Sequence, residues 1–449
     1  MWGPGSVFLE DGRIVAVTPA DPAPAWPESE VVDRRDCWIV PGFVQTHIHL
    51  CQTLFRGAAE GLTLFEWLER VVWPCEAALD AASMELSAVL GTHLLASTGT
   101  TTLLDMGTTH HTDVIARVVA RSGLRAFLGP AIMDRGPQHD LLRDEASARR
   151  EIDALASAWQ GHDDGRIRIA LCPRFVPSVS DRLYERLVEA PEYRDFLIHT
   201  HGSETREEVE QVRSLTGGRT PIEHLTAWDA AAGRLQIAHA VWVSDRDRAR
   251  LADTGSSVCH CPSSNYKLGS GSCDLAALQA AGVRVGLGAD GAACNNRLDP
   301  WMEMRLAAFN QSALRGPDTV DPAAILRLAT LGGAEALGLA DETGSLARGK
   351  SADLVVLDPT GDPGAAPGPL PEEDPAAWMV YAGSAALVRE TWVRGRPVFR
   401  RDEESKWYAD QGARIAEARA GLLDRAGLSA KRRPPAGTVP KAATSPRSR

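Results

Sequence analysis

The residues best placed to do chemistry are two histidines that follow an apolar stretch and are separated by one residue. The stretch from Cys37 to Val44 leads into His47 and His49. Because alternate side chains of an extended strand share a face, both imidazoles can point the same way and bind one metal ion. An isolated pair of this kind also occurs incidentally at strand ends, so the interpretation depends on partners elsewhere in the chain.

Three further side chains of metal-binding type lie at or near the carboxyl ends of apolar runs, namely His201, His239 and Asp290. Each has a plainer explanation by itself, such as a capping side chain, but together with the first pair they form a set of five. Imidazole and carboxylate ligands around open coordination positions suit Zn²⁺, with Fe²⁺ and Mn²⁺ as alternatives. We therefore predict one metal ion per subunit, which would lower the pKa of a bound water from about 15.7 toward about 7.

Glu204 follows His201 by three residues, which places it in the first turn of the next predicted helix. A carboxylate beside the metal could shuttle a proton from the attacking water to the leaving group. An acidic residue at a helix N-terminus is equally favoured for structural reasons alone.

Two features bear on the number and type of metal sites. The first lysine of the chain is Lys267, so no lysine from a middle strand can bridge two metals, and a single metal centre is predicted. The run Cys259-His260-Cys261 offers other ligands. In a strand, however, His260 faces away from the two thiols, and a buried strand is the better interpretation.

The elements that must position these residues are eight strand-like apolar runs that alternate with helical periodicity. Such βα units predict an α/β fold, a (β/α)8 TIM barrel, in which the carboxyl ends of all strands meet at one rim and the five side chains converge. The predicted strands are Trp38–His49, Thr100–Met106, Ala126–Met133, Ile167–Phe175, Phe196–His201, Leu235–Trp242, Ser256–Cys261 and Val283–Asp290.

Strand-rich segments flank the barrel on both sides. Gly5 to Thr18 is typical of a hairpin with Asp11-Gly12 at its turn, and Gly344 to Leu357 and Ala386 to Phe399 resemble antiparallel strands. The predicted domains are a small composite β-sandwich (1–40 and 345–402), the barrel (41–344), a C-terminal helix (403–429) and a disordered, basic, Pro-rich tail (430–449).

Composition excludes several kinds of partner. The 449 residues carry a net charge of −11, so neither nucleic acid nor an anionic membrane is expected to bind. The sequence shows no signal-peptide pattern and no apolar run of about 18 residues. The eight cysteines show no disulfide-like spacing. We therefore expect a cytoplasmic protein with reduced thiols.

As an ordered set, five motifs resemble the amidohydrolase superfamily. The resemblance is to the branch that holds methylthioadenosine/S-adenosylhomocysteine deaminases, guanine and 8-oxoguanine deaminases, and triazine chlorohydrolases. It covers about Gly5 to Phe399 and is far more specific for the superfamily than for a substrate. The motifs are PGFVQTHIH (41–49), HTHGSE (199–204), AHA (238–240), HCPSSNYKLGSG (260–271) and GADG (288–291).

The resemblance implies a metal site and a proton path. Asp290 would accept the proton of the attacking water, His239 would orient the hydroxide, and Glu204 would protonate a ring nitrogen as hydroxide adds to the adjacent C–NH2 carbon. Ammonia would then leave. The implied metal ligands are His47, His49, His201 and Asp290.

Two further points rest on the resemblance. His199 shares a strand face with His201, and only His201 has the His-x-x-Glu pattern of the family's ligand. Barrels of this type often pair, so a homo-oligomer, a dimer or larger, is implied.

The substrate clues conflict. Glu76 falls where adenosine-type deaminases keep the glutamate that holds the ribose hydroxyls. Arg174-Phe175 and Gln52 are instead similar to the base-recognition residues of guanine deaminases, since Arg174 could donate to a heterocycle and Gln52 could make a paired amide contact. Each also has a structural explanation: an ion pair for Arg174, a helix-start acid for Glu76 and a surface position for Gln52.

The main hypothesis is a mononuclear zinc aminohydrolase that replaces an exocyclic amine of a purine-type base or nucleoside by oxygen. Within hydrolases, the alternatives are a triazine chlorohydrolase or aminohydrolase and a pterin deaminase. From a different class, the alternative is an inactive scaffold that keeps only the barrel, which the complete ligand set disfavours.

Overall fold

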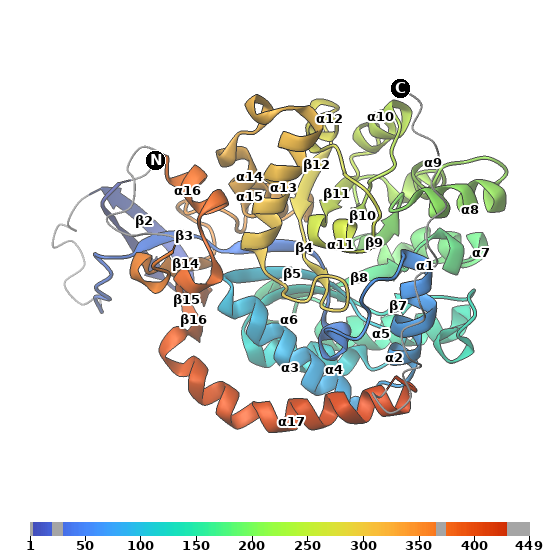
Figure 1. Ribbon diagram of the computed structural model, residues 1–449, viewed down its shortest axis with the longest axis horizontal. Helices are drawn as coiled ribbons and strands as arrows, with labels where there is room; N and C mark the ends of the chain where they lie inside the picture. Colours follow the sequence, from blue (N-terminus) through green and yellow to red (C-terminus); the bar gives the residue numbers. More distant parts are fainter. Residues whose placement is uncertain (1–2, 20–29, 365–373, 429–449) are drawn as a thin grey trace, which may run out of the picture.

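The computed structural model describes residues 3–19, 30–364 and 374–428 (Figure 1). The predicted tail at 430–449 lies outside these residues. Within the described ranges, no helix is long and apolar enough to cross a membrane.

Parallel strands form the centre of the molecule. In chain order they are β4 (Phe43–His49), β5 (Thr100–Met106), β6 (Arg125–Gly129), β7 (Ala131–Ile132), β8 (Ile167–Pro173), β9 (Leu197–Gly202), β10 (Leu235–His239), β11 (Ser257–His260), β12 (Arg284–Leu287) and β13 (Asp290–Gly291).

Eight of these strands close into a barrel. They pair in the order β4, β5, β6, β8, β9, β10, β11, β12, and β12 returns to β4 where Leu287 pairs with Gln45. The short strands β7 and β13 add to β8 and β4. With helices between the strands, this is the predicted (β/α)8 barrel. The apolar and β-branched composition of β4 and β5 fits their complete burial, as expected for parallel strands covered on both faces.

The predicted strand Trp38–His49 divides into two at Gly42, where the sequence reading was wrong. The Gly42 amide donates to the Asp353 carbonyl at 3.1 Å. A Cβ at this position would lie 2.2 Å from the Thr101 side chain. The chain therefore leaves one sheet and enters the barrel at a point where only glycine fits.

The residues before Gly42 belong to a separate antiparallel sheet. Its strands, in spatial order, are β16 (Arg396–Arg400), β15 (Val388–Val393), β14 (Leu354–Leu357) and β3 (Trp38–Pro41). The hairpin of β1 (Gly5–Glu10) and β2 (Arg13–Pro19) lies against this region, since the Ile14 amide donates to the Lys350 carbonyl at 2.8 Å. Segments from before and after the barrel thus meet at one side of it (Figure 1).

Helices surround the barrel, and several begin at a capping side chain that accepts from a backbone amide of the first turn, such as Asp80, Ser180, Thr205 and Ser244. They are α3 (Ala81–Ser97), α4 (Thr112–Ser122), α5 (Glu145–Trp159), α6 (His162–Gly165), α7 (Asp181–Val188), α8 (Arg206–Thr216), α9 (Pro221–Leu225), α10 (Asp245–Asp253), α11 (Pro262–Lys267), α12 (Leu275–Ala280), α13 (Pro300–Arg315), α14 (Pro322–Leu328) and α15 (Leu331–Ala336). Beyond the barrel follow α16 (Pro375–Tyr381) and α17 (Glu404–Arg425), and α17 runs along the outside next to α3 (Figure 1).

The long first connection is helical and largely buried. It consists of η1 (Leu50–Phe55), α1 (Leu64–Trp67), a π turn η2 (Leu68–Val72) and α2 (Trp73–Ala77). Its aromatic side chains Trp67 and Trp73 are each 4% exposed. The segment therefore packs as part of the main core rather than as a solvent loop.

Candidate active site

Four side chains from three parts of the barrel meet at the carboxyl ends of the strands. One ligand atom of each of His47, His49, His201 and Asp290 lies within 4.8 Å of the others. Asp290 Oδ1 is 3.2 Å from His47 Nε2 and 3.3 Å from His49 Nε2. All four residues were predicted from the sequence.

The hydrogen bonds behind these imidazoles test whether the set fits a metal. His49 Nδ1 lies 2.8 Å from the Met106 carbonyl, and His201 Nδ1 lies 2.7 Å from the Arg174 carbonyl. A carbonyl only accepts, so each Nδ1 carries hydrogen. Burial lowers the pKa of both rings, that of His49 to about 4, so they are neutral and each Nε2 presents a lone pair.

The two lone pairs face each other, since His49 Nε2 is 3.2 Å from His201 Nε2. Neither atom can donate to the other, whereas a cation between them would satisfy both. His47 Nε2 is also buried, and its close polar neighbour is Asp290 Oδ1 at 3.2 Å, another atom of the ligand set. Three imidazoles held by their second nitrogens and one carboxylate are a donor set that fits Zn²⁺.

His199, which the spacing alone left as a rival of His201, lies behind the cluster. Its Nε2 is 2.7 Å from Nδ1 of His47. His199 therefore supports the orientation of His47 and leaves the inward position on β9 to His201.

Glu204 and His239 lie next to each other beside the four candidate ligands. His239 Nε2 is 3.4 Å from Glu204 Oε2 and 3.8 Å from Asp290 Oδ2. Both side chains are buried, and burial raises the pKa of Glu204 above its ordinary value. A Glu204 that keeps its proton to higher pH is suited to act as a general acid.

The backbone at this rim is unusual. Ser203, His239, Ala240 and Asp290 have φ values of 56°, 75°, 45° and 58°, a left-handed region that side chains other than glycine seldom adopt. Glu208 supports the first of these turns by accepting from the Ser203 and Glu204 amides at 3.1 and 2.6 Å. Such conformations cluster where a fold holds side chains for function.

The candidate substrate residues Gln52, Glu76 and Arg174 lie together and bind one another. The Arg174 guanidinium donates to both Glu76 oxygens, at 2.6 and 3.0 Å, and Gln52 Nε2 donates to Glu76 Oε1 at 3.0 Å. Thr108 Oγ1 adds a fourth donor at 3.2 Å. All the usual acceptor positions of the Glu76 carboxylate are therefore filled. Phe175, beside Arg174, is buried with its ring centroid 6.4 Å from that of Phe65.

Replacing Arg174 by Met is expected to lower the free energy of unfolding by about 3 kcal/mol, because it leaves the Glu76 carboxylate buried and without its cation. Although burial alone would raise the pKa of Glu76, Arg174 holds it below its ordinary value. This stabilisation is therefore present at neutral pH and is lost as the pH falls through the folded-state pKa of Glu76. Urea unfolding at pH 7 and at lower pH measures both effects.

A matched control is the exposed pair of Arg213 and Glu210, whose side chains are 46% and 70% exposed. Arg213→Met should change the stability by less than about 1 kcal/mol. The double variant Glu76→Gln/Arg174→Met should be more stable than Arg174→Met alone. A single variant as stable as the wild type would show that the ion pair does not hold this region.

Sequence reasoning gave no role to two residues that contact the acid–base pair, although both lie in the quoted motif at 260–271. Asn265 Oδ1 lies 2.9 Å from His239 Nδ1, and Ser270 Oγ donates to Glu204 Oε1 at 3.0 Å. The available signal was a run of polar residues just after the strand that ends at His260, on the rim where the other site residues gather.

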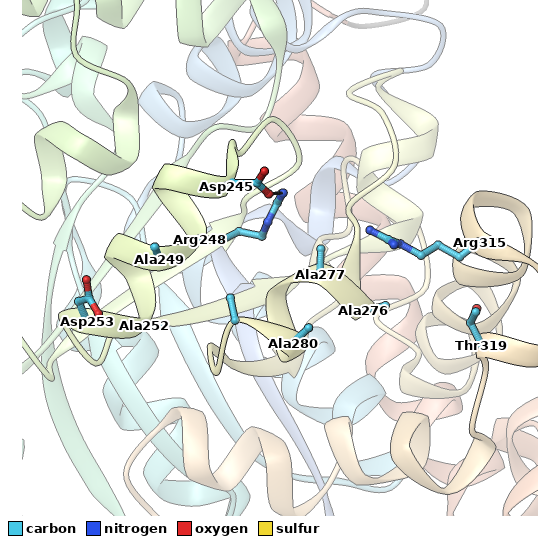
Figure 2. A pocket seen from close by; sticks show the side chains of 11 residues that line it. Asp245, Arg248, Ala249, Ala252, Asp253, Ala276, Ala277, Ala280, Arg315 and Thr319 are labelled. Carbon is cyan, nitrogen blue, oxygen red and sulfur yellow. Dashed lines mark hydrogen bonds and ion pairs between the residues drawn. The ribbon is translucent and has the colours of Figure 1, made fainter.

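An open groove of about 740 Å³ between α10 and α12 contains none of the predicted site residues (Figure 2). Its floor is formed by alanines such as Ala249 and Ala277. Its two arginines are already paired: Arg248 with Asp245, toward which Figure 2 shows it turned, and Arg315 with Asp274. Both arginines of the groove are therefore already neutralised, and none of the predicted catalytic or metal-binding residues lies in it.

Comparisons with known proteins point to one family. The family model described as "Amidohydrolase family" matches residues 38–398. The chain is 36% identical over 421 residues to a 5′-deoxyadenosine deaminase from Methanothermobacter thermautotrophicus, covering 93% of this chain and 95% of that protein.

Two solved structures are similar over almost the whole fold. An adenosine deaminase from Xanthomonas campestris with bound zinc has a TM-score of 0.84 at 32% identity, covering 94% of each chain. The guanine deaminase of E. coli has a TM-score of 0.81 at 30% identity, covering 88% of this chain and 93% of that one.

Proposed function

The chain belongs to the amidohydrolase family, and from this premise we propose that it is a mononuclear zinc-dependent deaminase of adenosine-type nucleosides. The observation that carries the proposal is the meeting of three neutral imidazoles and Asp290 opposite the pair of Glu204 and His239. A ligand set and a general acid on one rim are what hydrolytic loss of an amine requires.

In this proposal His47, His49, His201 and Asp290 would hold the metal, which when bound would supply hydroxide at about neutral pH. Asp290 takes up the proton of the attacking water. His239, whose Nε2 lies between the two carboxylates, orients the nucleophile.

Glu204 supplies the proton that the ring nitrogen needs. Its carboxyl donates to a ring nitrogen next to the C–NH2 carbon, so that the ring can accept the electron pair as the C–O bond forms. The amine then takes up the proton that Asp290 received from the water, the C–N bond breaks and ammonia leaves. The buried position of Glu204 excludes water as a competing proton acceptor.

The adenosine-type substrate rests on the relatives and on Glu76. The 5′-deoxyadenosine deaminase and the adenosine deaminase similar to this chain cover more than nine-tenths of it. By the resemblance to adenosine-type deaminases, Glu76 would hold the sugar hydroxyls of such a substrate. Because its acceptor positions are filled, a hydroxyl would have to displace a donor, and Thr108 at 3.2 Å is the most weakly held.

A guanine-type base is the second candidate, favoured by one observation at Gln52. Its Nε2 is bound to Glu76, but its Oε1 is buried without a hydrogen-bond partner in the described chain. This oxygen lies beside Gly291, where a Cβ would approach it to 2.1 Å. A free buried acceptor next to the metal-binding rim suits a heterocycle N–H.

The test is ammonia release by the zinc-loaded protein from a panel of heterocycles, with product mass checked for amine-to-oxygen exchange. The panel contains 5′-deoxyadenosine, methylthioadenosine, S-adenosylhomocysteine, adenosine, guanine, 8-oxoguanine, a pterin and a chlorotriazine. We expect turnover of the nucleosides. Turnover of guanine or 8-oxoguanine alone would favour the second candidate, and chloride release without ammonia would favour a triazine hydrolase. A protein that binds no metal and turns over nothing would support the inactive scaffold.

A further inference from the structure

One short segment after β11 contacts both acid–base groups of the site. Asn265 lies in α11 and Ser270 in the turn that follows, and they are 1% and 3% exposed. Ser270 Oγ donates to Glu204 Oε1 at 3.0 Å, and Asn265 Oδ1 accepts from His239 Nδ1 at 2.9 Å. We propose that Ser270 and Asn265 are positioning residues for the deamination, an inference that rests on the proposed function.

The segment is internally braced, so that its two contacts are fixed relative to each other. The Ser270 amide donates to the Asn265 carbonyl at 2.8 Å. The Ser270 carbonyl in turn accepts from Trp242 Nε1 at 2.7 Å, and the Arg206 guanidinium lies over the Trp242 ring at 4.0 Å. Both backbone polar groups of Ser270, its N–H and its carbonyl, are thus hydrogen-bonded.

The other end of the segment is anchored to a different part of the barrel. The Ser263 amide donates to Glu303 Oε2 at 3.0 Å, and Glu303 Oε1 also accepts from Asn295 Nδ2 at 2.7 Å. Lys267 Nζ donates to the Ala293 carbonyl at 2.9 Å and to Glu60 at 3.1 Å. These contacts tie α11 to the loop that follows Asp290 and to the first connection of the barrel.

The Ser270 contact determines which oxygen of Glu204 can carry the proton. An oxygen that accepts from a hydroxyl serves as the carbonyl oxygen of a protonated carboxyl group. With Oε1 occupied by Ser270, the acidic proton belongs on Oε2, the oxygen that lies 3.4 Å from His239 Nε2. Ser270 therefore leaves the acidic proton of Glu204 on the oxygen that faces His239.

The Asn265 contact determines which ring nitrogen of His239 carries hydrogen. Since Asn265 Oδ1 only accepts, His239 Nδ1 carries hydrogen and Nε2 is the nitrogen that faces Glu204 and Asp290. Neither Asn265 nor Ser270 needs to touch the substrate for this. Loss of either hydrogen bond should therefore lower kcat and leave KM almost unchanged.

The experiment is a double-mutant cycle with Ser270→Ala and Glu204→Gln, measured as ammonia release from the preferred substrate of the wild-type protein. We expect Ser270→Ala to lower kcat by about 10- to 100-fold, the range for a hydrogen bond to an ionisable group. KM should stay within about twofold. In the Glu204→Gln background, Ser270→Ala should lower the residual turnover no further, because its only effect passes through Glu204.

The matched control is Ser264→Ala on the same segment. Ser264 is also buried, but its hydroxyl is not a partner of Glu204 or His239. This variant should keep the wild-type kcat. Zinc content and thermal midpoint are measured for every variant, so that loss of metal or of folded protein is recognised.

A second double-mutant cycle, Asn265→Ala with His239→Asn, should show the same non-additive loss of kcat. If Ser270→Ala does not fold, this second cycle tests the positioning role. Effects that multiply in both cycles, or a Ser270→Ala variant with the wild-type kcat, would overturn the positioning role while leaving the deaminase assignment intact. A wild-type protein that releases no ammonia from any heterocycle would overturn both.

Discussion

Asp290→Asn is expected to abolish turnover, with a loss of kcat/KM of about 10⁴-fold or more, and to lose most of its bound zinc. The reason is that one side chain serves two purposes. Asp290 Oδ1 lies within 3.3 Å of both His47 and His49, where it completes the ligand set, and Oδ2 lies toward His239. An amide keeps the shape but removes both the negative charge and the proton acceptor.

The measurement combines zinc content by elemental analysis with ammonia release at saturating substrate. Asp299→Asn is the matched control, because Asp299 is another buried aspartate of the same loop that caps α13 by accepting from the Trp301 amide at 3.0 Å. Asparagine caps helices almost as well, so this variant should keep its metal and its rate. Full activity in Asp290→Asn would exclude the proposed mechanism.

Glu204→Gln is expected to lower kcat by about 10²- to 10⁴-fold while the zinc content stays at the wild-type level. Glutamine fills the same space but cannot deliver a proton to the ring nitrogen. Because burial raises the pKa of Glu204, the wild-type rate should decline on the alkaline side as this group loses its proton. That alkaline decline should be absent from the residual activity of the variant.

Glu207→Gln serves as the control, since Glu207 lies three residues after Glu204, in the first turn of α8, and is exposed. It should behave as the wild type. A Glu204→Gln variant that deaminates at the normal rate would mean that another group protonates the ring. A variant that also lost its metal would instead point to a structural role in the cluster.

The barrel strands and the polar residues at their carboxyl ends could be predicted from the sequence for a simple physical reason. Parallel strands are buried on both faces, so they appear as apolar runs, and β5 was predicted at its observed bounds of Thr100–Met106. Polar side chains that follow such runs stand out, which is how His201 and Asp290 were found. The break at Gly42 was missed because the chain remains apolar while it passes from one sheet to the other.

The substrate region was harder to predict because its contacts join distant segments. Glu76 and Arg174 are 98 residues apart, and each was read as a separate and competing clue to the substrate. The structure shows that they neutralise each other. Likewise, Ser270 reaches Glu204 across 66 residues, a contact that no local periodicity encodes. Spacing found the candidate metal ligands but left His199 as a rival of His201, and it gave no information on which side chains hydrogen-bond to one another.

The closure of β12 onto β4 has a consequence for the order in which the protein is made. The cluster needs His47 from the first barrel strand and Asp290 from β13, which pairs with β4 beside Ile48. During synthesis the carboxylate emerges last, long after the two histidines. A complete ligand set exists only once the ring of strands has closed, so the free energy of metal binding accrues to the finished barrel and not to partly made chains.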